Sequence, residues 1–183
     1  MNSTLRKITI ELNKANILWG LGGSAMLGAY HLVDVVNDID ILIAEHDIKQ
    51  AENILSAFAV KGMSITKEPF ATKHFHTYTY NNISIDVMAG FQIYHEAAGL
   101  YKLAFDRQTL TANMHIDDNF IPLSSLEDWY IIYALIPGRH YKADLIETYW
   151  KAHGIQNPYL ITRALKRSLP GPLRHKLEYL LRQ

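Results

Sequence analysis

Two aspartates one residue apart, Asp38 and Asp40, are the first residues of the chain whose type and spacing could do chemistry. In a strand, residues i and i+2 point to the same face, with Cα atoms roughly 6.5 to 7 Å apart. Two carboxylates at that separation can share a divalent cation, and oxygen-only ligands favour a hard ion such as Mg²⁺, which also accepts substrate phosphate oxygens. Taken alone, the pair is explained more simply as the solvated edge of a strand.

A glycine-rich turn, Gly22-Gly23-Ser24, precedes this pair, between a strand candidate at residues 17–19 and a helix candidate at residues 25–32. Glycines let backbone N–H groups approach a phosphate closely, and the N-terminus of the following helix adds positive potential. The Ser24 hydroxyl can donate a hydrogen bond to a phosphate oxygen. By itself, the segment is better explained as an ordinary strand-to-helix turn.

A third acid, Asp86, lies in the middle of the apolar run at residues 83–88. A charge there is costly to bury without a partner. Coordination of a metal ion, or use as a general base, would account for it. The alternative is one polar face of an antiparallel strand, because Ser84 and Met88 share the face with Asp86. The residues themselves leave both interpretations open.

Taken together and in this order, the three motifs resemble the DNA polymerase β-like nucleotidyltransferase superfamily. Its pattern is a hydrophobic-Gly-(Gly/Ser) turn, a gap of about a dozen residues, an Asp-hydrophobic-(Asp/Glu)-hydrophobic strand, and a third acid between hydrophobic residues. The chain matches these parts with residues 21–24, 38–41 and 85–87. Its size and layout are similar to those of small antibiotic nucleotidyltransferases, and equally to those of nucleotidyltransferase toxins of bacterial toxin–antitoxin systems.

The resemblance implies a role for each motif. Asp38 and Asp40 would hold Mg²⁺, as one ion or a pair, together with ATP or another NTP. Asp86 would be the third catalytic and metal-binding acid and would take the proton of the attacking hydroxyl. The Gly22-Gly23 backbone and Ser24 would bind the β- and γ-phosphates of the nucleotide. The implied reaction is in-line attack on the α-phosphorus, with release of pyrophosphate.

The elements that must position these residues follow from hydrophobic periodicity. Composition changes at Pro122, which predicts a catalytic domain over residues 1–120 and a helical segment over residues 121–183. The expected fold class is α+β, with a nucleotidyltransferase-type mixed sheet and helices on one face. Strands are predicted at residues 17–19, 38–43, 63–66, 75–80 and 83–88, and further extended segments at 100–105 and 109–116. Helices are predicted at residues 5–14, 25–32, 48–58, 126–136, 143–153, 159–168 and 173–181.

Charged residues in the helical segment offer two further candidates. Lys142 is predicted to face a nucleotide phosphate, with a solvated charged turn as the equal alternative, and whether Arg139 and Asp144 contact the nucleotide stays open. The basic C-terminal residues could meet an RNA acceptor such as tRNA, although a solvated helical surface is the favoured explanation. They are Arg163, Lys166, Arg167, Arg174, His175 and Lys176.

The bulk composition restricts the class of protein. Lysine plus arginine equals aspartate plus glutamate, 18 against 18, so there is no overall basic signal for nucleic acid. The chain has no cysteine, which excludes disulfides and thiolate metal sites and fits a cytoplasmic protein. No apolar run approaches the roughly 18 to 20 residues that span a bilayer, so no membrane partner is expected.

The sequence therefore predicts a Mg²⁺-dependent transferase that moves NMP from an NTP to a hydroxyl acceptor. The acceptor could be an antibiotic, a tRNA or a protein, and neither it, the preferred base nor the oligomeric state follows from the sequence. The alternative is a non-catalytic nucleotide-binding or toxin–antitoxin partner module that retains the fold.

Overall fold

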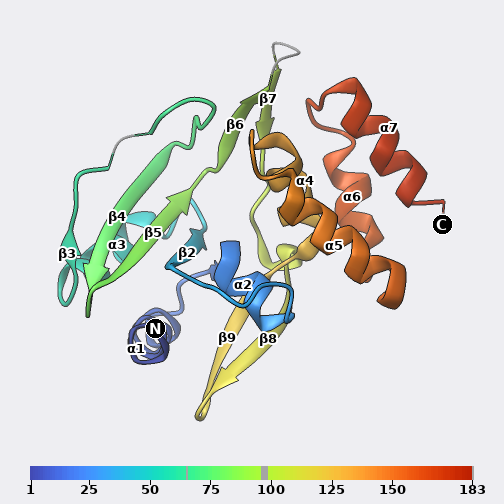
Figure 1. Cartoon of the computed structure of the whole chain (residues 1–183). Helices are drawn as coiled ribbons and strands as arrows, with labels where there is room; N and C mark the ends of the chain where they lie inside the picture. The colour runs from blue at the N-terminus through green and yellow to red at the C-terminus, as the bar shows by residue number, and fades with distance from the viewer. Residues whose placement is uncertain (65, 96–98, 183) are drawn as a thin grey trace.

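The computed structural model describes residues 1–64, 66–95 and 99–182 (Figure 1). Its helices are α1 (Asn2–Lys14), α2 (Gly23–Ala29), α3 (Ile48–Ser56), α4 (Leu126–Leu135), α5 (His140–His153), α6 (Pro158–Ala164) and α7 (Gly171–Leu180). Its strands are β1 (Trp19–Leu21), β2 (Asp38–Ile43), β3 (Val60–Lys61), β4 (His74–Tyr80), β5 (Ile83–Ala89), β6 (Gln92–His95), β7 (Gly99–Lys102), β8 (Leu110–Ile116) and β9 (Asn119–Ser124). A 3₁₀ turn, Arg107–Thr109, precedes β8.

The central element is a seven-stranded mixed sheet in the order β3-β4-β5-β2-β1-β9-β8, and β6 and β7 form a separate hairpin. Strand β2 runs antiparallel to β1 and parallel to β5. Alternation along β2 sends Ile39 and Ile41 to the face opposite the acids, where both are fully buried. They belong to the same hydrophobic core as Ile8 of α1 and Leu55 of α3. The mixed sheet predicted from the sequence is confirmed.

The C-terminal helices lie across from β4 and β5, on the far side of β2 (Figure 1). Helix α4 begins where predicted, because Ser125 Oγ accepts a hydrogen bond from the Asp128 N–H at 3.1 Å. Almost the whole of α4 is buried, so this helix packs tightly enough to fix the side chains that it presents to the sheet. The predicted domain division at residue 120 stays a prediction; β9 spans it, and Gln183 lies outside the described residues.

One predicted strand is absent from the described part of the chain, and another, expected at residues 17–19, is displaced to β1 at Trp19–Leu21. The absent strand is the one at residues 63–66. Residues 63, 64 and 66 of the strand expected at 63–66 are not in a strand, and Ile65 lies outside the described residues. The strand in this region is β3, which pairs with β4. After β3, the Thr77 N–H of β4 donates a hydrogen bond to the side-chain oxygen Ser64 Oγ at 2.8 Å. Among the described residues, it does not donate to a backbone carbonyl there, as it would if the strand pairing continued. The alternation of apolar and polar residues there imitates a half-buried strand, but Met63 is 87% exposed.

None of the described helices combines the length and the apolar character needed to cross a membrane.

Candidate active site

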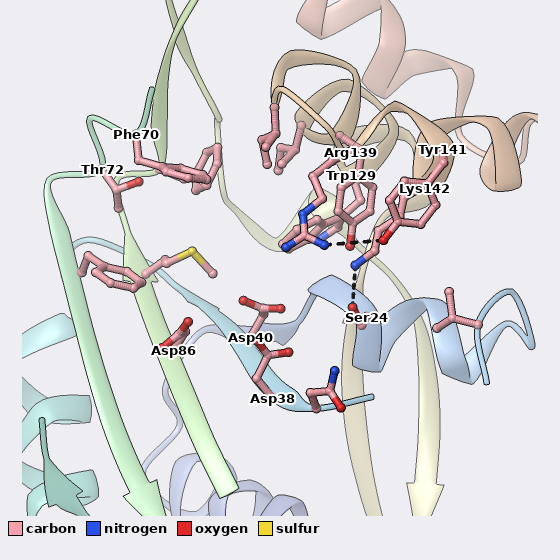
Figure 2. Close-up of a pocket in the computed structure, with 18 of the residues that line it drawn as sticks. Ser24, Asp38, Asp40, Phe70, Thr72, Asp86, Trp129, Arg139, Tyr141 and Lys142 are labelled. Carbon is pink, nitrogen blue, oxygen red and sulfur yellow. Dashed lines mark hydrogen bonds between the residues drawn. The ribbon is translucent and has the colours of Figure 1, made fainter. Parts of the chain in front are cut away.

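The three aspartates lie together on one face of the sheet (Figure 2). Because β2 and β5 are parallel neighbours, their register pairs Asp40 with Asp86 and Asp38 with Ser84. All three carboxylates line a cavity of about 760 Å³. The structure thus brings Asp86 next to Asp38 and Asp40, although it lies far from them in the sequence.

The pKa values of two of the carboxyls are raised, mainly by burial. Burial, and then the neighbouring charges of Asp38 and Asp86, raise the pKa of Asp40 to about 7. Burial also raises the pKa of Asp86, although a hydrogen bond from Thr77 Oγ1 to Asp86 Oδ1 at 3.0 Å opposes the shift. Ionising all three acids together is therefore unfavourable without a compensating cation.

Gly23, the first residue of α2, lies against the acids. Its φ is +58°, and a Cβ atom there would lie 1.7 Å from Asp40 Oδ2. The preceding residue, Gly22, donates a backbone hydrogen bond to the Asp40 carbonyl oxygen at 2.9 Å. A Cβ on Gly22 would lie 2.2 Å from the Trp129 ring. Both glycines are therefore required for close packing, at Asp40 and at Trp129 respectively.

Gly23→Ala is expected to lower the free energy of unfolding by at least about 1–2 kcal/mol, the cost of a left-handed conformation for a residue with a Cβ. It should also displace the Asp40 carboxylate. Urea denaturation measures the effect. The matched control is Gly171→Ala, because a Cβ at Gly171 meets nothing within 4 Å and the backbone there is unstrained. Equal stability of the two variants would contradict the geometry described for Gly23.

The opposite wall of the cavity is cationic. Lys142, on α5, donates a hydrogen bond from Nζ to Ser24 Oγ at 2.6 Å, although the two residues are 118 positions apart. The Lys142 side chain is buried, and its Nζ lies 5.1 Å from the centre of the Tyr133 ring. Arg139, just before α5, lines the same wall and donates a hydrogen bond to the Tyr141 hydroxyl at 3.5 Å (Figure 2). The predicted nucleotide-binding residues Ser24 and Lys142 thus meet in space.

The structure also places the other charged residues that the sequence singled out. Asp144 is not among the residues that line the cavity. Among the basic C-terminal residues, three donate to protein groups: Arg163 to Asp106, Arg174 to backbone carbonyls, and Lys176 to Glu147. These contacts support a structural role for part of this basic surface.

The cavity also contains residues that sequence reasoning did not single out. Trp129 and Tyr133 come from one face of α4, and Phe70, Thr72, Phe75, Met88 and Phe91 come from the chain around β4 and β5. The spacing of Trp129 and Tyr133 at i and i+4 gives a helix face. That pattern does not distinguish a cavity wall from ordinary core.

The donor set fits a magnesium ion that is completed by substrate. Across residues 1–64, 66–95 and 99–182, no three His, Asp or Glu side chains are grouped so that they could hold a metal ion by themselves. Mg²⁺ usually takes only one or two carboxylates and fills its shell with water and substrate phosphates. Asp38, Asp40 and Asp86 offer hard oxygen donors and excess negative charge at one place, which is what such an ion requires.

Known structures have the same fold. A Thermotoga maritima protein considered a nucleotidyltransferase is 24% identical, with a TM-score of 0.61 over 82% of this chain and 92% of its own. ANT(2'')-Ia in complex with adenylyl-2''-tobramycin is 12% identical, with a TM-score of 0.57 over 88% of this chain and 97% of its own. The lincomycin-bound lincosamide adenylyltransferase LnuA is 10% identical, with a TM-score of 0.53 over 80% of this chain and 96% of its own.

No protein-family model matches the sequence. No curated protein matches it either. The structural likeness confirms the nucleotidyltransferase fold that the sequence motifs implied.

Proposed function

We propose that this chain, which has the nucleotidyltransferase fold, is a Mg²⁺-dependent enzyme that transfers NMP from an NTP to a hydroxyl acceptor and releases pyrophosphate. The observation that carries the proposal is the juxtaposition of three carboxylates on adjacent strands with a cationic wall across the same cavity. A non-catalytic nucleotide-binding module could use Ser24 and Lys142 for phosphate, but it would not need a third acid, Asp86, beside the Asp38–Asp40 pair. ATP is the proposed donor for two reasons. One structural neighbour, ANT(2'')-Ia, is bound to an adenylylated product, and another, LnuA, is an adenylyltransferase.

Each residue of the site has a separate proposed role. Asp38 and Asp40 hold Mg²⁺, which when bound neutralises phosphate charge and polarises the reacting groups. Lys142 Nζ and Ser24 Oγ bind the terminal phosphates, since they are the donors nearest each other on the cationic wall. Asp86 accepts the proton of the acceptor hydroxyl. The hydroxyl oxygen bonds to the α-phosphorus while the bond from that phosphorus to the bridging oxygen breaks, and pyrophosphate leaves.

A small-molecule acceptor is favoured over RNA. The two neighbours with named ligands are bound to an adenylylated tobramycin and to lincomycin. In this chain, Arg163, Arg174 and Lys176 make contacts within the protein, and the net charge is zero. Binding to an RNA backbone would call for a free basic surface.

The test is release of pyrophosphate from each of the four NTPs, in Mg²⁺ and in EDTA, with pooled hydroxyl-bearing small molecules, with tRNA, or with neither. We expect release that needs Mg²⁺ and rises with a small-molecule pool. Release that is absent under all conditions, while the folded protein binds NTP, would favour the non-catalytic alternative.

Lys142→Met is expected to weaken binding of Mg²⁺–NTP by about 10- to 100-fold, because hydrogen bonds to charged groups are worth about 1.5–3 kcal/mol. Calorimetry with a non-hydrolysable analogue measures it. Lys151→Met, on the same helix but with a largely exposed side chain, is the matched control and should bind normally. Equal affinities for the two variants would remove Lys142 from the nucleotide site.

A further inference from the structure

The two walls of the cavity differ in charge, although both carry apolar side chains, since Trp129, Ile132 and Ile136 line the helical side. On the helical side are Ser24, Arg139 and Lys142, and on the side of β4 and β5 are Phe70 and Thr72, with the acids between the two walls (Figure 2). The cationic side suits phosphate. The other side, called here the apolar wall, consists of Phe70, Thr72, Phe75, Met88 and Phe91.

The apolar wall is built directly onto the acid-bearing strand. Met88 lies two residues beyond Asp86 on β5 and therefore on the same face, and the register of β4 and β5 places Phe75 opposite Met88. The wall continues into Phe91 and Phe70, whose rings meet edge to face with centres 6.3 Å apart. Phe70 is 37% exposed. An aromatic ring with this much free surface inside a cavity can pack against a ligand.

The apolar wall offers no charge for a cationic ligand. Among the described lining residues, the one carboxylate besides the three aspartates of the site is that of Asp34. It lies in the loop between α2 and β2. The charged lining residue next to the apolar wall in sequence is a cation, Lys67, which is exposed. Away from Asp86, a polycation on the apolar wall would meet aromatic rings and Lys67, and the charge of Lys67 would repel it.

The geometry of in-line transfer indicates whether the NTP or the acceptor packs against the apolar wall. The attacking and leaving oxygens lie on opposite sides of the reacting phosphorus. If the pyrophosphate leaves toward Ser24 and Lys142, the acceptor oxygen must approach from the opposite side, past Asp86. That is the side of Met88 and Phe75.

We propose that the acceptor is an uncharged, largely apolar small molecule that packs against Phe70, Phe75, Met88 and Phe91 with one hydroxyl at Asp86. This inference rests on the proposed nucleotidyl transfer and adds the chemical class of its acceptor. The acceptor's O–H proton passes to Asp86, its oxygen gains the NMP group, and pyrophosphate is the leaving group, so no further reactant is needed.

The probe is N-phenyl-1-naphthylamine, a neutral aromatic dye whose fluorescence rises in apolar sites. It is titrated into the full chain with and without saturating Mg²⁺ and a non-hydrolysable NTP, whose own binding is measured separately by calorimetry. Competitors are 2-phenylethanol, which is neutral and carries a hydroxyl, and tobramycin, which is polycationic. The variants are Phe70→Ala and Phe75→Ala, with Phe120→Ala as control, because Phe120 is 52% exposed on β9 and does not line the cavity. Circular dichroism confirms that each variant is folded.

We expect the dye to bind with the nucleotide present, 2-phenylethanol to displace it, and tobramycin to have no effect. Phe70→Ala and Phe75→Ala should each weaken dye binding by roughly 5- to 10-fold, from lost apolar contact, while Phe120→Ala should not. Displacement of the dye by the nucleotide would overturn the proposal in favour of a nucleobase on the apolar wall. Displacement by tobramycin, or dye binding insensitive to both variants, would also overturn it. A wild-type protein that binds the dye but no Mg²⁺–NTP would instead refute the proposed function.

Discussion

Asp86→Asn is expected to lose turnover by about 10²-fold or more, the usual scale for a missing general base, while binding Mg²⁺–NTP within a few-fold of the wild type. Asparagine keeps the size of the side chain and can still accept the hydrogen bond from Thr77 Oγ1. It cannot take up the proton of the acceptor hydroxyl. Removing one of three neighbouring negative charges could even tighten triphosphate binding slightly.

The measurement for this variant is paired: nucleotide affinity and single-turnover rate in the same preparation. Ser84→Ala is the control, because Ser84 shares the β5 face with Asp86 but carries no charge. Normal turnover by Asp86→Asn would mean that Asp86 is only a strand residue. A loss of nucleotide affinity as severe as that of Asp38→Asn would assign it to metal anchoring, and the base would lie elsewhere.

Asp38→Asn is expected to abolish Mg²⁺-dependent nucleotide binding, a loss of at least roughly 10²-fold, because replacing residues that merely support metal ligands already costs about 10- to 100-fold. The fold should survive, since Asp38 is half-buried at the cavity rather than in the core. Calorimetry with a non-hydrolysable NTP, alongside a urea denaturation curve, separates the two effects.

Asp34→Asn is the matched control for Asp38→Asn. It removes one negative charge from the same cavity, but at an exposed position in the loop before β2. If both variants lost affinity equally, the effect would be one of general charge. If Asp38→Asn bound nucleotide normally, Asp38 would be an ordinary strand residue.

The parts of the site that local rules govern were predictable. Alternation in a strand places Asp38 and Asp40 on one face whatever the neighbouring strands are. The glycine-rich junction between β1 and α2 was recognisable from the sequence too, although α2 begins at Gly23, two residues earlier than predicted. The sequence does not show that a Cβ at Gly23 would strike Asp40. The Ser125 cap of α4 is also a local signal, and the helix begins where that signal places it.

What depends on packing between distant segments could not be predicted. The pairing of Asp40 with Asp86 requires the parallel register of β2 and β5, and the Ser24–Lys142 hydrogen bond joins residues 118 positions apart. The apolar wall escaped notice for another reason. Residues such as Phe75 and Met88 follow the same hydrophobic pattern whether they fill a core or line a cavity.

The central claim is tested most directly by calorimetry of the wild-type chain with non-hydrolysable analogues of the four NTPs, in Mg²⁺ and in EDTA. The three carboxylates facing Ser24, Lys142 and Arg139 predict that at least one analogue binds in Mg²⁺, with the ATP analogue binding most tightly. This binding should disappear in EDTA. Absence of binding by all four analogues to the folded protein in Mg²⁺, or binding of equal strength in EDTA, would contradict the account.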